Sequence, residues 1–359
     1  MRILVCPPDH FDVDYVINPW MEGQIGRIDV ARARSQWESL FEDVSATASV
    51  ESIAPRERSP DMCFTANAGL LESGRVLPAR FRMPERSGEE APFAEWFENA
   101  GFEIAEPSGN DPFEGEGDAL FQPGEPLLWA GYGVRTALET HIALSSLFDV
   151  EVVSLRLVDP RFYHLDTCFA PLPGGRLIYY PAAFDRRSRT EIESRIPAER
   201  RLAVSDIDAM NFACNTLRVG DRLFMNAATD ALRDVLATWD FETRIHRVDE
   251  FLKAGGGVKC LSLLLEQPDF DRNGASRPSP IRSAQIQLRG HLLDAGLLRR
   301  GLDVVTEANG SFRVDALDLA ERKDQESHAM LHVVAPSEED LDEIVEGLVE
   351  LGAEPTKIR

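Results

Sequence analysis

Apolar positions along the first three quarters of the chain follow two spacings in turn. Short runs rich in β-branched and aromatic residues, bounded by Gly, Pro or Asp, predict strands at 2–7, 151–157, 176–181 and 222–228. Apolar residues that recur at intervals of three and four predict helices at 30–44, 189–196 and 229–239. We therefore expect residues 1–268 to form an α/β domain of many short units.

The pattern changes at residues 269–280, which are dense in Pro, Asp, Asn, Gly and Ser and are typical of a linker. Ser337, which is followed by acidic residues, is a good N-cap for the last helix of the segment beyond this linker. The order strand, helix, strand, strand, helix predicts a small plait-like α+β module at 281–359. These elements are expected at 283–293, 294–309, 311–320, 327–336 and 337–352.

The net charge of the chain limits the classes of binding partner that we expect. Acidic residues outnumber basic ones by 61 to 38, and the net charge of −23 opposes binding to nucleic acid or anionic lipid. The first apolar run has only four residues before two prolines, so it predicts neither a signal peptide nor an anchor. We expect no nucleic-acid partner, no membrane partner and a small-molecule substrate.

The five cysteines, at positions 6, 63, 168, 214 and 260, are scattered and include no CxxC pair. This spacing favours neither a disulfide framework nor a zinc site, so a reduced, cytoplasmic location is expected. No metal and no cofactor are expected. Most free cysteines are small core residues, and context must decide whether any of these is reactive.

Four stretches in the first domain concentrate ionisable or amide groups among Gly, Pro and aromatic residues. They are PDMCFTANAG (60–69), FEGEGDAL (113–120), FYHLDTCF (162–169) and GGGVKC (255–260). In the last, three glycines would let backbone approach a ligand at Cys260, or form a plain turn before a core strand. Lys259 is expected to favour the thiolate by its charge.

Two of these stretches would present acids on one face if they were extended. His164 and Asp166 would then point to the same side and could serve as an acid–base pair, or form a surface pair on an edge strand. Glu114, Glu116 and Asp118 alternate with glycine, which suits a metal, a cationic organic substrate or an acidic turn facing water.

Arginines supply the opposite charge. Arg135 in GYGVRT could clamp a substrate carboxylate through two hydrogen bonds, although most arginines are only solvated. Arg86 is a weaker candidate of the same type. Carboxylates, an arginine, and a thiol with a histidine would together suit a zwitterionic substrate and covalent chemistry.

Taken in order, the four stretches and GYGVRT resemble the guanidino-group-modifying enzymes, the pentein superfamily that includes arginine deiminases, dimethylarginine hydrolases and amidinotransferases. INPWMEG (17–23), the TANAG loop and NFACN (211–215) resemble bacterial arginine dihydrolases in particular. The resemblance covers residues 1–265. It implies an α/β-propeller with five ββαβ units around a pseudo-fivefold axis and the site in the central channel.

The same resemblance implies roles for individual residues. Cys260 would be the nucleophile, His164 the general acid and base, and Glu114 the carboxylate that pairs with the guanidinium. Asp166 would bind the guanidinium nitrogens, and Arg135 together with Arg86 would bind the substrate's carboxylate. Asn18 and Asp118 would line the pocket around the α-amino end. We expect hydrolysis of L-arginine to ornithine, ammonia and carbon dioxide through a covalent thiouronium.

Asn67 departs from the deiminase pattern, which usually has aspartate there. An amide both donates and accepts hydrogen bonds, and it would hold the neutral ureido group of citrulline better than a second anion would. This favours a dihydrolase. A dimethylarginine hydrolase, a deiminase that stops at citrulline, and a non-catalytic arginine-binding protein are the alternatives.

The C-terminal part carries a second resemblance. RGHLLDAGLLRRGLDVV and NGSFRV resemble the middle module of longer bacterial proteins, in which a dihydrolase domain precedes an ornithine cyclodeaminase-like domain. The chain has no GxGxxG turn, so no nicotinamide-binding domain is expected. We expect the module to serve subunit contact or regulation, or to be an appendage without function, and the protein to be a homo-oligomer.

Overall fold

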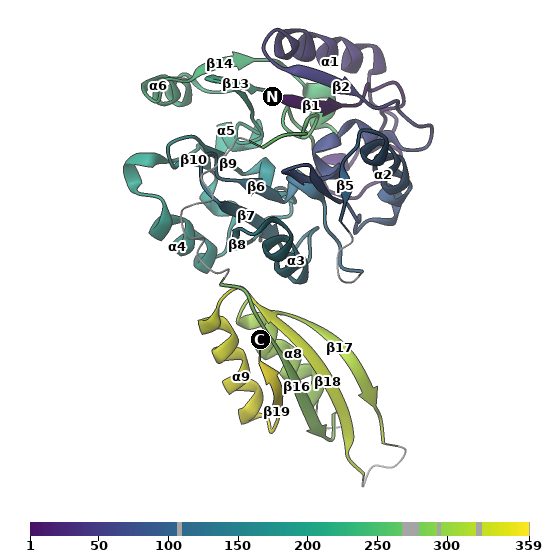
Figure 1. Ribbon diagram of the computed structural model, residues 1–359, viewed down its shortest axis with the longest axis vertical. Helices are drawn as coiled ribbons and strands as arrows, with labels where there is room; N and C mark the ends of the chain where they lie inside the picture. The colour runs from purple at the N-terminus through teal and green to yellow at the C-terminus, as the bar shows by residue number, and fades with distance from the viewer. Residues whose placement is uncertain (106–109, 268–279, 293–295, 321–324, 359) are drawn as a thin grey trace. The chain divides into compact units, whose positions relative to one another are not determined.

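The computed structural model of the protein describes residues 1–105, 110–267, 280–292, 296–320 and 325–358 (Figure 1). The chain forms two compact units, Met1–Thr136 with Leu155–Ala275 and Ala137–Ser154 with Ser276–Arg359. Residues 269–279 of the predicted linker lie outside the described residues. The division into 1–268, 269–280 and 281–359 stays a prediction.

Five three-stranded sheets occur among the described residues, and they share one strand order. In each sheet the central strand pairs antiparallel with one neighbour, and in four sheets its pairing with the other neighbour is parallel. The sheets are β15 (Leu263–Leu264), β1 (Arg2–Val5) and β2 (Ser49–Ser52); β3 (Gly69–Glu72), β4 (Arg75–Pro78) and β5 (Glu103–Ile104); β6 (Ala119–Phe121), β7 (Leu127–Tyr132) and β8 (Glu151–Arg156); β9 (Phe169–Leu172), β10 (Arg176–Tyr179) and β11 (Arg201–Ala203); β12 (Leu217–Val219), β13 (Arg222–Met225) and β14 (Glu242–Ile245).

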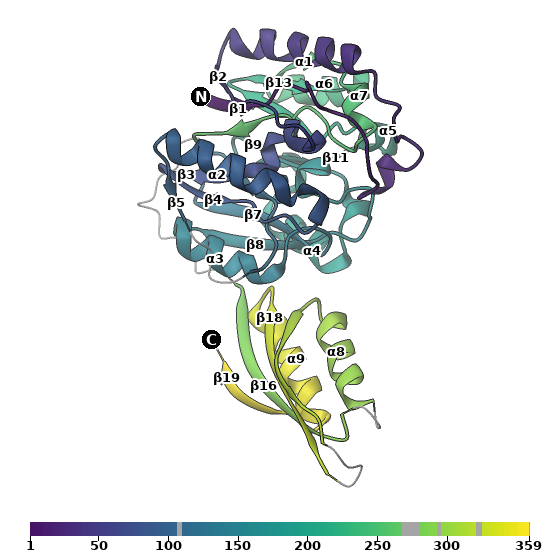
Figure 2. The same ribbon diagram turned by 90° about the vertical axis from the view of Figure 1, so that its right-hand side faces the viewer.

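A helix joins the central strand of each sheet to the strand that follows it. These helices are α1 (Val30–Ser45), α2 (Glu90–Asn99), α3 (Leu138–Phe148), α4 (Arg186–Arg195) and α6 (Asp230–Thr238). Two shorter helices, α5 (Asp206–Met210) and α7 (Asp249–Leu252), precede β12 and β15. α2 lies along β4 and β5 (Figures 1 and 2). The mixed α/β class and the predicted strands and helices are confirmed, with ends that shift by a few residues.

Helix α1 shows how the apolar spacing produces this arrangement. The Asp29 side chain caps the helix by accepting a hydrogen bond from the Arg32 N–H. Leu40, Phe41 and Val44 recur at helical spacing and are buried in the core that also contains Cys260. The same core therefore supports both the outer helix and the loop that carries the thiol.

The C-terminal residues form a four-stranded antiparallel sheet in the order β17-β18-β16-β19, with two helices packed against it (Figure 2). Its elements are β16 (Arg282–Gly290), α8 (Leu297–Glu307), β17 (Ser311–Asp318), β18 (Ser327–Ala335), α9 (Glu338–Glu350) and β19 (Glu354–Ile358). Ser337 caps α9, as expected, by accepting from the Asp340 N–H. Strand β19 is an addition to the sequence-based expectation.

In the described ranges, every helix is too short or too polar to cross a membrane.

Candidate active site

The nine residues that the sequence marks as site candidates are all buried. They are Asn18, Asn67, Arg86, Glu114, Asp118, Arg135, His164, Asp166 and Cys260. Most of them lie in a connection just before a strand that pairs antiparallel with the central strand of its sheet. Asn67 precedes β3, Glu114 and Asp118 precede β6, His164 and Asp166 precede β9, and Cys260 precedes β15.

Two of these connections correct an expectation from the sequence. Glu114–Asp118 and His164–Asp166 contain 3₁₀ turns instead of extended backbone. Gly115 permits the first turn because its φ is +58°, and an added Cβ would lie 2.7 Å from the Ala66 oxygen. Alternate residues therefore do not share one face, and neighbouring acids have different partners.

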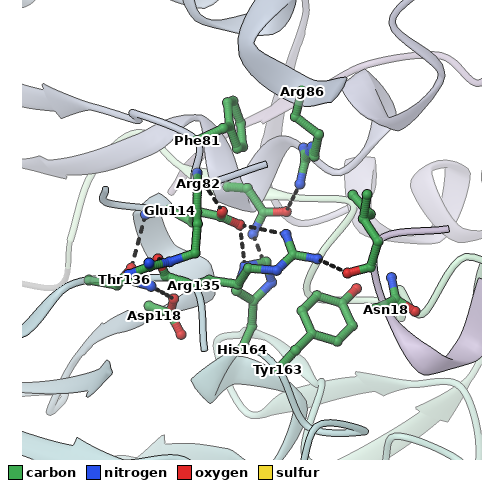
Figure 3. A network of polar contacts seen from close by, with 12 residues as sticks. Asn18, Phe81, Arg82, Arg86, Glu114, Asp118, Arg135, Thr136, Tyr163 and His164 are labelled. Carbon is green, nitrogen blue, oxygen red and sulfur yellow. Dashed lines mark hydrogen bonds and ion pairs between the residues drawn. The ribbon is translucent and has the colours of Figure 1, made fainter. Parts of the chain in front are cut away.

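The imidazole of His164 lies between Glu114 and Asn67 (Figure 3). Its Nε2 is 2.6 Å from Glu114 Oε2, and its Nδ1 is 3.4 Å from Asn67 Nδ2. The guanidinium of Arg86 has only donors and bonds Asn67 Oδ1 at 2.8 Å, which turns the amide nitrogen of Asn67 toward the imidazole. Nδ1 is then an acceptor, and Nε2 carries the proton that Glu114 accepts.

Glu114 is fully buried and still ionised. Burial by itself would raise its pKa, but Arg135 and His164 outweigh burial and lower the pKa to about 2. Arg135 donates from Nη1 to Glu114 Oε2 at 3.1 Å and from Nη2 to the Ile17 carbonyl at 2.8 Å (Figure 3). The backbone N–H of Arg82 donates to Glu114 Oε1. The site thus holds a negative charge beside the imidazole.

Cys260 contacts a second carboxyl group. The thiol donates to Asp166 Oδ2 at 3.4 Å, and the Asn215 amide nitrogen lies 3.1 Å from the sulfur. Burial and the neighbouring Asp166 raise the pKa of the thiol well above its ordinary value. Burial also raises the pKa of Asp166 to about 7, although Lys259 opposes it. The free site therefore favours a neutral thiol at neutral pH.

The thiol loop and the histidine segment are joined by hydrogen bonds. The Ala66 N–H, next to Asn67, donates to the Cys260 carbonyl at 3.1 Å. The Tyr163 hydroxyl, next to His164, donates to the Gly255 carbonyl at 2.8 Å. The thiol loop is thus hydrogen-bonded to the segments that carry Asn67 and His164.

Close packing explains the three glycines before the thiol. Gly255 has a φ of +81°, and a Cβ there would lie 2.9 Å from Asn18 Oδ1. A Cβ at Gly256 would lie 2.1 Å from the ring of Phe64, and one at Gly257 would lie 2.6 Å from Asn215 Oδ1. The glycines bring backbone against neighbouring side chains and form the turn before β15, whereas approach of this backbone to a ligand stays a prediction.

Three charged residues near the thiol have structural partners. Asp118 accepts from the backbone N–H groups of Leu165 and Thr136 and so fixes the segment after His164. Burial raises the pKa of Asp118 to about 6. Lys259 Nζ bonds Glu116 Oε2 at 2.7 Å. Its charge is therefore paired with Glu116 rather than placed on the thiol, which corrects the role expected for it.

The predicted substrate contacts of Arg86 and Asn18 stay predictions. Arg86 makes a two-point ion pair with buried Glu89, with nitrogen–oxygen distances of 3.0 and 2.8 Å. The Asn18 amide donates to the Ala254 carbonyl at 3.0 Å and accepts from the Trp20 N–H. These partners hold both residues in place beside the network.

Two buried residues escaped the sequence-based candidate set. Asn215 contacts the sulfur of Cys260, and its only signal was its place in the NFACN stretch. Asp61 lies in the PDMCFTANAG stretch, and its Oδ2 accepts from the Tyr15 hydroxyl at 2.8 Å. Asp61 Oδ1 and Asp166 Oδ1 have no hydrogen-bond partner among the described residues, which is unusual for buried polar atoms.

In the described part of the chain, no group of three or more His, Cys, Asp or Glu side chains is arranged to hold a metal ion.

Known proteins that are similar in sequence to this chain indicate the family to which it belongs. The chain is 49% identical over 99% of its length to the bifunctional arginine dihydrolase/ornithine cyclodeaminase ArgZ of Synechocystis sp., and it spans 50% of that protein. It is 37% identical to the N(G),N(G)-dimethylarginine dimethylaminohydrolase of Mycobacterium tuberculosis, with 73% of this chain matching 85% of that one. The chain belongs to the pentein superfamily of guanidino-group-modifying enzymes.

A solved structure of a pentein domain supports this family assignment. The N-terminal domain of cyanobacterial ArgZ, in a cysteine-to-serine variant bound to substrate, is 51% identical and superimposes with a TM-score of 0.73. The match covers 74% of this chain and 98% of that domain. A family model described as the LOR/SDH bifunctional enzyme conserved region matches residues 283–359. The chain spans about half the length of the curated dihydrolases that it matches.

Proposed function

We propose that the protein hydrolyses L-arginine to ornithine, ammonia and carbon dioxide. The observation that carries this proposal is two buried pairs, Cys260 with Asp166 and His164 with Glu114, which offer a nucleophile, an acid–base group and carboxylates for a guanidinium. The identity with arginine dihydrolases along the whole chain supports the same assignment.

Charge provides a reason for the thiol to react only when substrate is bound. Burial and Asp166 raise the pKa of Cys260, so the free site holds a thiol. A guanidinium placed against Asp166 and Glu114 neutralises the anions that oppose ionisation, and it stabilises the thiolate by direct attraction. Arginine thereby activates its own nucleophile.

The first round then produces citrulline. His164 takes the proton of the Cys260 thiol, and the sulfur forms a bond to the guanidinium carbon. The imidazolium returns that proton to the departing nitrogen, the carbon–nitrogen bond breaks, and ammonia leaves. His164 next takes a proton from water, which attacks the thiouronium carbon and expels the thiolate. Glu114 stabilises the positive charge of the guanidinium and of the imidazolium.

A second round on the ureido group releases the second ammonia. The thiolate attacks the ureido carbon, ammonia leaves, and water cleaves the carbonyl–sulfur adduct to give ornithine and carbon dioxide. Asn67 supports this round because its amide pairs with a neutral ureido group and leaves His164 Nδ1 free of an opposing acceptor. A carboxylate at position 67 would favour the cationic first substrate instead.

The α-ammonium group of the substrate needs an anionic partner, and its α-carboxylate needs a cationic one. Asp61 Oδ1 is buried and unpartnered, which suits an α-ammonium group together with Asn18. Arg135 and Arg86 are the candidate partners of the α-carboxylate. Glu114 and Glu89 form ion pairs with these two arginines and hold them in position.

The finer features of the fold are also part of the proposal. Five sheets of the same strand order support an α/β-propeller of five ββαβ units with the network in its central channel. The sheet and two helices at 281–359 support a plait-like module. Its proposed role is subunit contact or regulation, in a protein that acts as a homo-oligomer. Five free, buried cysteines support a reduced, cytoplasmic location.

Two related activities are the alternatives. The identity with a dimethylarginine dimethylaminohydrolase supports release of methylated amine from methylated arginine. A deiminase would stop after the first round.

Product stoichiometry separates these functions. Purified protein is incubated with L-arginine, and ornithine, citrulline and ammonia are quantified over time. The proposal predicts two ammonia for each ornithine. One ammonia for each citrulline would instead establish a deiminase, and turnover of methylated arginine alone would establish the hydrolase of methylated substrates.

A further inference from the structure

The amide of Asn215 contacts Cys260 at both of its ends. Its Nδ2 lies 3.1 Å from the Cys260 sulfur, and its Oδ1 accepts from the Cys260 N–H at 3.1 Å. The Asn215 side chain has no exposed surface. A buried amide that spans both the sulfur and the backbone of the nucleophile is well placed to control the charge state of the sulfur.

The orientation of this amide follows from its partners. The Cys260 N–H is a donor and needs an acceptor, so it fixes the oxygen of the Asn215 amide on that side. The nitrogen must then face the sulfur, and it also points to the Asp166 carbonyl at 3.2 Å. Asn215 therefore presents N–H donors, and no acceptor, to the thiol.

The surrounding backbone is shaped around the amide. The Lys259 N–H donates to the Asn215 carbonyl, and the Asn215 N–H donates to the Phe212 carbonyl at 2.9 Å. Phe212 adopts a φ of +54°, a conformation that most side chains avoid, in the turn that presents Asn215. Gly257 has no Cβ to displace the amide oxygen. Four separate features thus converge on one side-chain position.

The ionisable groups near the sulfur do not replace this donor. Asp166 carries an acceptor, the Tyr163 hydroxyl is directed to the Gly255 carbonyl, and Lys259 is paired with Glu116. Among the described residues the sulfur has two N–H donors, the side-chain amide of Asn215 and the backbone N–H of Gly257, and both lower the pKa of the thiol. Asn215 supplies the side-chain donor to a thiolate formed here.

We propose that Asn215 is a further catalytic residue, whose amide N–H stabilises the Cys260 thiolate during attack and when the sulfur leaves again. The proposal rests on the proposed function, because it assigns a donor to the nucleophile of that reaction. Preorganised donors aimed at a charge that develops during reaction are typically worth about 100-fold or more in kcat.

Asn215→Asp is the discriminating variant. Aspartate keeps an oxygen acceptor for the Cys260 N–H but replaces the donor at the sulfur with a second oxygen. Asn226→Asp is the matched control, because Asn226 is equally buried and also bridges two backbone groups, the Asn211 carbonyl and the Val248 N–H, without contacting the sulfur.

Two readouts are taken from each protein. The first is the rate of iodoacetamide alkylation of Cys260 against pH, followed by peptide mass spectrometry. The second is kcat and KM for arginine. In Asn215→Asp we expect the alkylation midpoint to rise by about one pH unit or more, and kcat to fall about 100-fold with KM changed less than about threefold. Asn226→Asp should leave the alkylation midpoint unchanged.

An unchanged alkylation midpoint in Asn215→Asp overturns the proposal, even if kcat falls, because the role of Asn215 would then be structural. An equal shift in Asn226→Asp also overturns it. If Asn215→Asp does not fold, the side-chain amide of Asn215 is followed by NMR in the unaltered protein. Its nitrogen shift should titrate with the alkylation midpoint, and a flat profile contradicts the proposal. Because alkylation needs no substrate, a protein without arginine turnover would refute the proposed function separately.

Discussion

At the scale of single residues, the hydrogen-bond donors and acceptors determine how the side chains of the site are oriented. Arg86 can only donate, so it turns Asn67, which in turn fixes the tautomer of His164. Glu114 stays ionised in a fully buried position because Arg135 and His164 compensate for burial. The proposed chemistry thus depends on a chain of side chains, each of which has one acceptable orientation.

A substitution of Asn67 tests this series of side-chain contacts. In Asn67→Asp, an acceptor replaces the N–H that faces His164 Nδ1, and the added charge favours a cationic guanidinium over a neutral ureido group. We predict that the product ratio shifts from ornithine toward citrulline, as measured by amino-acid analysis. Asn99→Asp, at an exposed helix end, is the control. An unchanged ratio of the two products would remove the argument about the amide.

Asp166 makes stability depend on pH. Burial raises its pKa from 3.8 to about 7, so the folded state binds the proton more tightly than the unfolded state. This contribution to the free energy of unfolding is full below pH 4 and is lost as the pH rises to 7. In Asp166→Asn, we predict a smaller difference between urea midpoints at pH 5 and pH 8 than in the unaltered protein. Equal differences in the two proteins would show that Asp166 does not have the raised pKa.

At the scale of elements, each of the five sheets has one edge strand that follows a tight turn, and most of the site candidates lie in those turns. The turns before β3, β6, β9, β12 and β15 carry Asn67, Glu114, His164, Asn215 and Cys260, in that order. Each turn is buried, so close backbone packing limits which residues it accepts.

The glycines of the thiol loop show this limit. In Gly256→Ala, the new Cβ would lie 2.1 Å from the Phe64 ring, which is itself buried in the core. Overpacking should lower the free energy of unfolding by about 1–3 kcal/mol. Gly88→Ala is the control, because the nearest atom to its Cβ is 3.9 Å away. Urea denaturation that gives equal stability for both variants would contradict this packing.

Prediction from the sequence succeeded where local spacing determines the structure. The apolar periodicity of α1 and the Ser337 cap fix those helices without long-range information. It failed at Glu114–Asp118 and His164–Asp166, because 3₁₀ turns form there against distant backbone. Asn215 was missed because its contact with Cys260 joins residues 45 positions apart. Comparison of the five turns that precede these edge strands is the signal that would have found it.

At the scale of the whole molecule, the candidate site residues are concentrated in one part of the sequence. The nine candidate residues and Asn215 lie between positions 18 and 260, whereas the sheet and helices at 281–359 have a core of their own that includes Ile286, Leu331 and Ile344. The net charge of −23 favours solubility.

Truncation tests this separation. We predict that residues 1–267 alone fold, as judged by circular dichroism, and retain kcat for arginine within about threefold, because the site network lies within them. A folded fragment without turnover would show that residues 268–359 contribute to the site.

The central claim is that the sulfur of Cys260 attacks arginine, and the most direct test is the rate of ornithine and ammonia formation by Cys260→Ala. The control is Cys6→Ala, which removes another buried thiol. The account predicts that Cys260→Ala loses more than about 1,000-fold in kcat, whereas Cys6→Ala retains turnover. Arginine turnover by folded Cys260→Ala at a rate near that of the unaltered protein would contradict the account.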